Sequence, residues 1–125
     1  MKRFLVFAGL FAAAFTAVPG AASAHAFPEH QVPGAGAKLD RPPKVVTIRF
    51  DRALEPAFSV LRVENSAGSR VDANDSHAIN DSNDTLEVTL KPLASGQYHV
   101  FWTAVARDGH RSHGDYMFTV RKSAR

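Results

Sequence analysis

Cysteine is absent from all 125 residues of this chain. Disulfides and thiolate metal sites are therefore excluded, and the fold must be held together by a packed core. Any transition-metal site predicted from this composition has to rely on nitrogen and oxygen ligands. The sequence also contains no run of lysine and arginine, no internal repeat and no convincing helical periodicity beyond its first residues.

The first 24 residues have the pattern of a secretory signal peptide. The basic start Met1-Lys2-Arg3 precedes an uncharged apolar run from Phe4 to Val18, and Ala22-Ser23-Ala24 fits an A-x-A cleavage site. The apolar run is shorter than the ~20 residues that a membrane-spanning helix needs. We therefore predict export with cleavage after Ala24, although Ala24-His25-Ala26 leaves a cut after Ala26 open.

Cleavage after Ala24 leaves residues 25–125, enough for one domain and too few for two. Without Lys2 and Arg3, this mature chain has 13 basic and 12 acidic residues, so it is almost neutral. A near-neutral chain without a basic patch gives no reason to expect a nucleic-acid partner.

Alternation of apolar and polar residues dominates the mature chain. In "KVVTIRF" the side chains of Val46, Ile48 and Phe50 share one face. The same pattern recurs in "VLRVEN", "LEVTLK", "YHVFW" and "YMFTV", with a short strand expected in "SRVD" and a helical turn in "RALEPAF". We predict an all-β fold, a small antiparallel Greek-key β-sandwich or barrel of about seven strands.

Two further expectations concern packing and loops. The polar stretch from Asp72 to Asp84 is predicted to be a mobile loop, since Ile79 is its single aliphatic anchor. The aromatic residues expected in the core are Phe50, Phe58, Tyr98, Trp102 and Phe118.

Six histidines follow the signal peptide, and His25 would be the first residue after a cut at Ala24. A terminal histidine offers its α-amine and its Nδ1 to the same metal ion. The amine has an ordinary pKa of about 7.7–8.0, so a metal must displace a proton to bind there. Two nitrogens in one plane suit Cu(II), which favours tetragonal N,O coordination. The alternative is that cleavage leaves a histidine there by chance.

The segment "ARDGHRSHGDYMF" contains a second candidate. Asp108 and His110 flank Gly109 at a predicted hairpin corner, where one carboxylate oxygen and one imidazole nitrogen can face the same way. An Asp-Gly turn with an incidental histidine is the alternative interpretation. A metal site here requires the N-terminus to fold back across this corner.

These motifs together resemble the CopC family of periplasmic copper-binding proteins over nearly the whole mature chain. The resemblance rests on the post-cleavage "HA" and on the segments "PGAGAKL", "VVTIRFDRALEPAFS", "LEVTLKPLASGQYHVFW" and "DGHRSHGDYMFTV". It implies a cupredoxin-like or immunoglobulin-like β-barrel or sandwich. It also implies one Cu(II) held by the amine and imidazole of His25 and by Asp108 and His110 of a D-x-H motif.

The function that this resemblance implies is a copper carrier or buffer in copper homeostasis or resistance. Such a protein would work in the periplasm as a monomer and pass its ion to a separate CopD-type inner-membrane protein. An enzyme is not expected. One alternative is a histidine-brace copper monooxygenase, but the carboxylate ligand and the small size of the chain argue against it. The other alternative is an immunoglobulin-like interaction module without metal.

The chain also departs from the family pattern. Some members hold Cu(I) in a methionine-rich segment, but here "NDSHAINDSND" stands in that region and Met117 is the one methionine after the signal peptide. We therefore predict a Cu(II)-only protein, since Cu(I) favours thioethers. Arg111 replaces a frequent proline after the D-x-H histidine.

The other histidines are expected to have minor roles. His30 and His113 are weak candidates for an additional contact, His77 for a loosely held second ion, and His99 is expected to be exposed. Glu29 and Arg107 are candidates for hydrogen bonds around the metal site.

Overall fold

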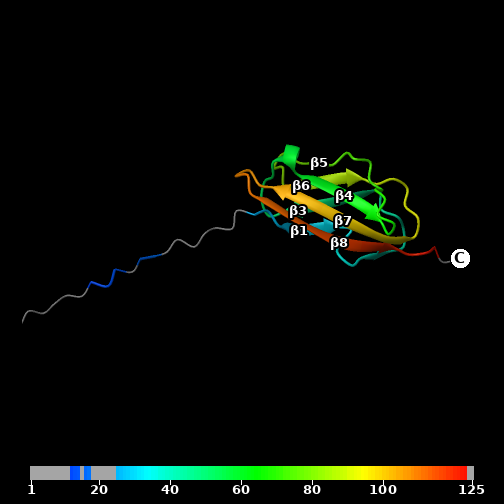
Figure 1. The fold of residues 1–125 in the computed structure, drawn as a ribbon, viewed down its shortest axis with the longest axis horizontal. Coiled ribbons are helices and arrows are strands. Elements are labelled where there is room, and N and C mark those ends of the chain that lie inside the picture. Colours follow the sequence, from blue (N-terminus) through cyan, green and yellow to red (C-terminus); the bar gives the residue numbers. More distant parts are fainter. Residues whose placement is uncertain (1–11, 15, 18–24, 124–125) are drawn as a thin grey trace, which may run out of the picture.

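The computed structural model describes residues 12–14, 16–17 and 25–123, and residues 28–120 form two β-sheets that pack face to face (Figure 1). The predicted signal peptide lies mostly outside the described residues. The first sheet has the order β1 (Pro28–Val32), β3 (Val45–Phe50), β6 (Thr85–Thr89) and β5 (His77–Ala78). The second has the order β2 (Lys38–Leu39), β8 (Arg111–Val120), β7 (Gly96–Val105) and β4 (Val60–Asn65).

Neighbouring strands run antiparallel except for the short parallel pair of β2 and β8, in which Lys38 lies opposite Thr119. The prediction of an all-β sandwich is confirmed. The described strands number eight rather than seven, because β2 and β5 have two residues each and are too short to show an alternating pattern. The helical turn expected in "RALEPAF" is the 3₁₀ turn η1 (Pro56–Phe58). None of the described residues belongs to a helix that is long and apolar enough to cross a membrane.

The core consists of the inward-facing residues of both sheets, as the alternation predicts. Phe50 and Trp102 meet edge to face with ring centroids 5.4 Å apart, and Tyr98 stacks on Phe118 at the same separation. The Trp102 indole lies directly over Gly114, where a Cβ would come within 2.6 Å of the ring. Four of the five predicted core aromatics are therefore in the core.

The prediction for Phe58 is wrong, because 66% of its surface is exposed. Phe58 ends the η1 turn, and its N–H donates to the Glu55 carbonyl at 3.1 Å. This turn buries none of its residues against the sheets, and the alternating pattern of β4 begins only after it, at Val60. The side chain therefore points away from the core.

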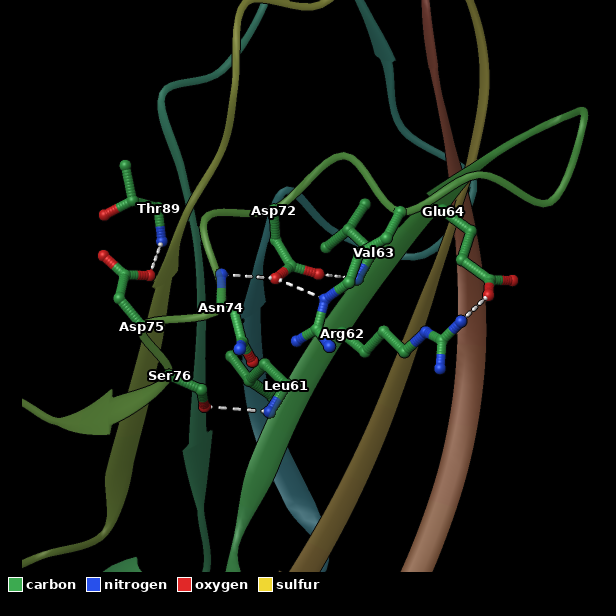
Figure 2. Close-up of polar contacts among 10 residues, drawn as sticks. Leu61, Arg62, Val63, Glu64, Asp72, Asn74, Asp75, Ser76 and Thr89 are labelled. Carbon is green, nitrogen blue, oxygen red and sulfur yellow. Dashed lines mark hydrogen bonds and ion pairs between the residues drawn. The ribbon is translucent and has the colours of Figure 1, made fainter.

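The segment from Asp72 onward, predicted as a loop, is tied to the sheets by its own polar side chains (Figure 2). The Asp72 carboxylate is fully buried and accepts hydrogen bonds from the N–H groups of Val63 and Asn74 and from Arg70 Nε, each at 2.8 Å. Buried carboxylates need such partners, because burying a charge without them is costly. In place of the strand expected in "SRVD", the structure has two isolated bridges, in which Arg70 lies opposite Glu64 and Asp72 opposite Leu90.

Two further side chains continue this attachment. The Asp75 carboxylate accepts the Thr89 N–H at 2.8 Å, and Ser76 Oγ accepts the Leu61 N–H at 2.9 Å (Figure 2). The next two residues form β5, which pairs with β6. The same polar residues that predict a loop therefore connect this segment to strands of both sheets.

Candidate metal centre

The β7–β8 hairpin turns at residues 106–110, where Asp108 and His110 are both exposed. The Gly109 N–H donates to the Ala106 carbonyl at 2.8 Å, and the Ala106 N–H donates to the His110 carbonyl at 2.9 Å. Gly109 has a φ of 89°, which glycine adopts without the steric cost that a side chain would bring. The predicted hairpin corner is therefore present.

Asp108 and His110 face each other across this turn. Asp108 Oδ1 accepts the His110 N–H at 3.1 Å and lies 3.1 Å from His110 Nδ1. The hydrogen bond from the His110 backbone lowers the pKa of Asp108, and the His110 side chain and the positive charge of Arg52 act in the same direction. The carboxylate is therefore held in the ionised form that a metal ligand requires.

The N-terminal end of the domain lies against the same corner. The His25 and His110 ring centroids are 5.6 Å apart and the rings are tilted by 38°. The Phe27 ring also lies near His25, at a centroid distance of 6.2 Å. The chain thus folds back across the hairpin, as a site built from His25, Asp108 and His110 requires.

Residues 25–27, which we call the strap, are held to the rest of the domain at two points. Ala26 is fully buried, and its carbonyl accepts a hydrogen bond from Ser112 Oγ in β8. Phe27 pairs with Asp51, the residue after β3: the Phe27 N–H donates to Asp51 Oδ1 at 3.0 Å, and the Asp51 N–H donates to the Phe27 carbonyl at 2.9 Å. These contacts fix the position of His25 next to the hairpin.

The electrostatics of Asp51 fit this anchoring role. Burial acts to raise the pKa of its carboxyl, but the Phe27 N–H and the Arg52 guanidinium together outweigh burial and lower it. Arg52 Nε donates to Asp51 Oδ1 at 3.3 Å. Asp51 is therefore an ionised acceptor for the strap at neutral pH.

Three further histidines lie on strands rather than in the hairpin turn. His30 is exposed in β1 opposite Arg49, and His113 is exposed in β8 opposite Thr103. His77 is exposed in β5, where its Nδ1 lies 2.7 Å from the Asp75 carbonyl oxygen.

Of the two residues proposed to surround the site, one lies beside it and the other does not. Glu29 lies 3.7 Å from Arg49, on β1 and β3, rather than beside the hairpin tip. Arg107 is exposed and shares a shallow depression with Asp108 and Arg52. Sequence reasoning missed Arg52, Asp51 and Ser112, which act on the site through charge and through the backbone of the strap.

The donor set fits a transition metal that favours nitrogen and oxygen. Two imidazoles and one carboxylate match the N,O ligands of Cu(II), and cleavage before His25 would add an amine. Within residues 25–123, no three His, Asp or Glu side chains are already gathered closely enough to hold a metal ion. A metal ion held by all three residues would require the exposed His25 ring to shift towards Asp108.

Comparison with known proteins gives a consistent assignment. The CopC domain model matches residues 29–121. The copper transport protein CutJ of Bacillus subtilis is 33% identical over 107 residues, which is 85% of this chain. The chain spans only about one fifth of CutJ, since the match covers 20% of that protein.

Two solved structures share the fold. CopC from Methylosinus trichosporium OB3b has 32% sequence identity and a TM-score of 0.72, over 78% of this chain and 94% of that one. PcoC, a methionine-rich copper resistance protein from Escherichia coli, has 27% identity and a TM-score of 0.66, over 78% of this chain and all of PcoC. The chain described here therefore belongs to the CopC domain family.

Proposed function

We propose that the exported chain binds one Cu(II) ion at the tip of the β7–β8 hairpin and acts as a periplasmic copper carrier or buffer. The ligands are the α-amine and imidazole of His25, the carboxylate of Asp108 and the imidazole of His110. The observation that carries this proposal is the 5.6 Å approach of the His25 and His110 rings beside an ionised carboxylate. Copper transport and copper resistance relatives of the same family support the choice of metal.

Cleavage after Ala24 is part of this proposal, because it frees the amine of His25. The alternative cut after Ala26 would remove a fully buried residue and its hydrogen bond from Ser112. The packing of Ala26 thus favours residues 1–24 as the signal peptide and residues 25–125 as the working domain.

The exposure of the ligands suits a carrier better than an enzyme. The His110 and Asp108 side chains are 55% and 48% exposed, so a partner protein can reach the ion directly. A carboxylate ligand favours Cu(II) and opposes cycling through Cu(I). We propose that the monomer delivers its ion to a separate CopD-type membrane protein. In CutJ, a copper transport protein, the region shared with this chain makes up about one fifth of the length.

The test is a Cu(II) titration of the exported protein, followed by native mass spectrometry and electron paramagnetic resonance. We expect a chain that begins at His25 and holds one copper ion. Asp108→Ala and His110→Ala should each weaken binding by more than about 100-fold, because even changes outside the ligand set typically cost about 10–100-fold. One extra residue before His25 should weaken binding comparably, since it moves the free amine away from the imidazole.

His77→Ala is the matched control, because His77 is an exposed histidine of the same chain away from the hairpin tip. Its Cu(II) affinity should equal that of the unaltered protein. Equal affinity in all of these variants, or an exported chain that begins at Phe27, would refute the ligand assignment.

A further inference from the structure

The outer face of the β2-β8-β7-β4 sheet places a histidine next to a methionine, two residue types that can bind metal ions. His99 of β7 lies directly opposite Met117 of β8 on one side and Glu64 of β4 on the other. His99 stands between the inward-facing residues Tyr98 and Val100, so its side chain is on the outer face. Directly opposite residues in an antiparallel pair have Cβ atoms about 4.5–5.5 Å apart. The imidazole and the thioether are therefore within reach of a shared ion.

A carboxylate and an aromatic ring orient the His99 imidazole. Its Nε2–H donates a hydrogen bond to Asp115 Oδ2 of β8. The Phe101 ring packs against the imidazole with a centroid separation of 4.1 Å. A hydrogen bond from one ring nitrogen to a carboxylate fixes the tautomer and leaves the lone pair of the other nitrogen available, which is the usual arrangement of metal-binding histidines. Among the described residues, the His99 ring makes this one hydrogen bond, through Nε2. Its Nδ1 is therefore the atom available to a metal ion.

The two side chains open onto a surface groove of about 260 Å³, lined by His99 and Met117 together with Glu64, Ser66, Gly68 and Gln97. Met117 is 38% exposed although it is an apolar residue, and it lines this groove. The carboxylate of Asp115 adds negative potential, which favours the approach of a cation, whereas the Glu64 carboxylate is neutralised by its ion pair with Arg62 (Figure 2).

We propose that His99 Nδ1 and Met117 Sδ form a two-ligand site for a soft monovalent ion, Cu(I), with Asp115 as the residue that positions the imidazole. Thioether sulfur is the type of ligand that Cu(I) selects and that harder cations avoid. This proposal departs from the sequence-based prediction of a Cu(II)-only protein, which no observation on this structure contradicts. The site uses two residues on facing strands, in a chain that has no methionine-rich segment.

This site is separate from the hairpin tip. His99 lies six residues before the end of β7 at Val105, which corresponds to about 20 Å at about 3.3 Å per residue. The inference therefore does not rest on the proposed Cu(II) site.

The probe for this site is Ag(I), a redox-inert ion with the ligand preference of Cu(I), added to exported protein that carries ¹³C-methyl methionine. We expect one equivalent of Ag(I) to shift the Met117 methyl signal and the His99 ring signals. Met117→Leu, a volume-conserving change at an exposed position, and His99→Gln should each weaken this binding more than about tenfold while leaving the fold intact. Anaerobic titration with Cu(I) against a chromophoric chelator should give the same order of affinities.

Asp115→Asn tests the positioning role. It should weaken Ag(I) binding less than the loss of either ligand does, while the shift of the Met117 methyl at saturation is retained. His113→Gln is the matched control, because His113 is an exposed histidine on the same face of β8, four residues from Met117. Its Ag(I) affinity should be unchanged.

An unshifted Met117 methyl at one equivalent of Ag(I), or equal affinity in the Met117→Leu variant, would overturn the proposal. The two proposed sites can fail independently. Met117→Leu and His99→Gln should keep the Cu(II) affinity of the hairpin tip, and His110→Ala should keep the Ag(I) response of Met117.

Discussion

At the scale of single residues, Tyr116 combines a packed position with an unusual polar atom. It faces inward from β8 opposite Val100, and only 7% of its surface is exposed. Its hydroxyl is buried, and no hydrogen-bond partner for it exists among the described residues. Burial raises the pKa of this phenol, because the charged form would lose its hydration.

Replacing Tyr116 with Phe should therefore stabilise the protein by about 1 kcal/mol at pH 7, since a buried polar group without a partner costs about 1–3 kcal/mol. Because the pKa of this phenol is higher in the folded than in the unfolded protein, its contribution to the free energy of unfolding is constant below about pH 10. This contribution falls as the pH rises above that value. The advantage of Tyr116→Phe over the unaltered chain should thus grow by about 1.4 kcal/mol per pH unit there. Urea unfolding of both proteins at pH 7 and pH 11 measures this. If the difference in free energy of unfolding between the two proteins is the same at both pH values, the pKa of Tyr116 is not raised by folding.

At the scale of elements, the strap determines where His25 lies. Its two attachment points belong to different parts of the fold, since Ser112 is in β8 and Asp51 follows β3. Neither residue is a proposed ligand. Their effect on copper should therefore come through the backbone positions of Ala26 and Phe27.

Ser112→Ala should lower the Cu(II) affinity about tenfold, comparable to the loss of a hydrogen bond that orients a ligand. The electron paramagnetic resonance spectrum of the copper-loaded variant should stay the same, because the ligands are unchanged. Asp51→Asn keeps an oxygen that can accept the Phe27 N–H and should retain most of the affinity, whereas Asp51→Ala should not. If Ser112→Ala binds as tightly as the original chain, the strap is not a positioning device.

The strands and the strap differ in how far they could be predicted. The alternating segments predicted β3, β4, β6, β7 and β8, because one-sided burial imposes a period of two on the sequence. β2 and β5 are too short for this signal, and they exist through pairing with β8 and β6. Phe58 was predicted to be in the core because it is aromatic, but the turn that contains it faces outward.

The contacts of the strap have no local signal at all. Ser112 and Ala26 are 86 residues apart, and Phe27 and Asp51 are 24 apart. The proposed ligand set came from the terminal histidine, the D-x-H spacing and the family resemblance, whereas its supporting residues required the structure. The His99–Met117 pair was missed because only the strand register places these two residues side by side.

At the scale of the whole molecule, the proposed copper site joins the segment before β1 to the turn between β7 and β8. Copper bound to the folded form alone should raise stability by about 2.7 kcal/mol at a free ion concentration of 100 times Kd. For a domain of this size, 1 kcal/mol shifts Tm by about 4–8 °C, so a rise of about 10–20 °C is expected. Calorimetry with and without Cu(II) measures the shift, and His110→Ala, which lacks a ligand, should show little of it. An equal shift in that variant would place the stabilising ion elsewhere.

The strap also lets the metal take over the role of a covalent cross-link. An ion held between His25 and His110 closes a loop of about 86 residues, and a disulfide across a loop of that size is worth roughly 4–5 kcal/mol in the chain-entropy account. This cysteine-free chain would thus gain a reversible cross-link between its N-terminal strap and the β7–β8 turn. The copper-bound protein would resist unfolding and proteolysis, and the copper-free protein would lose that protection. The lifetime of the protein would therefore depend on whether copper is bound.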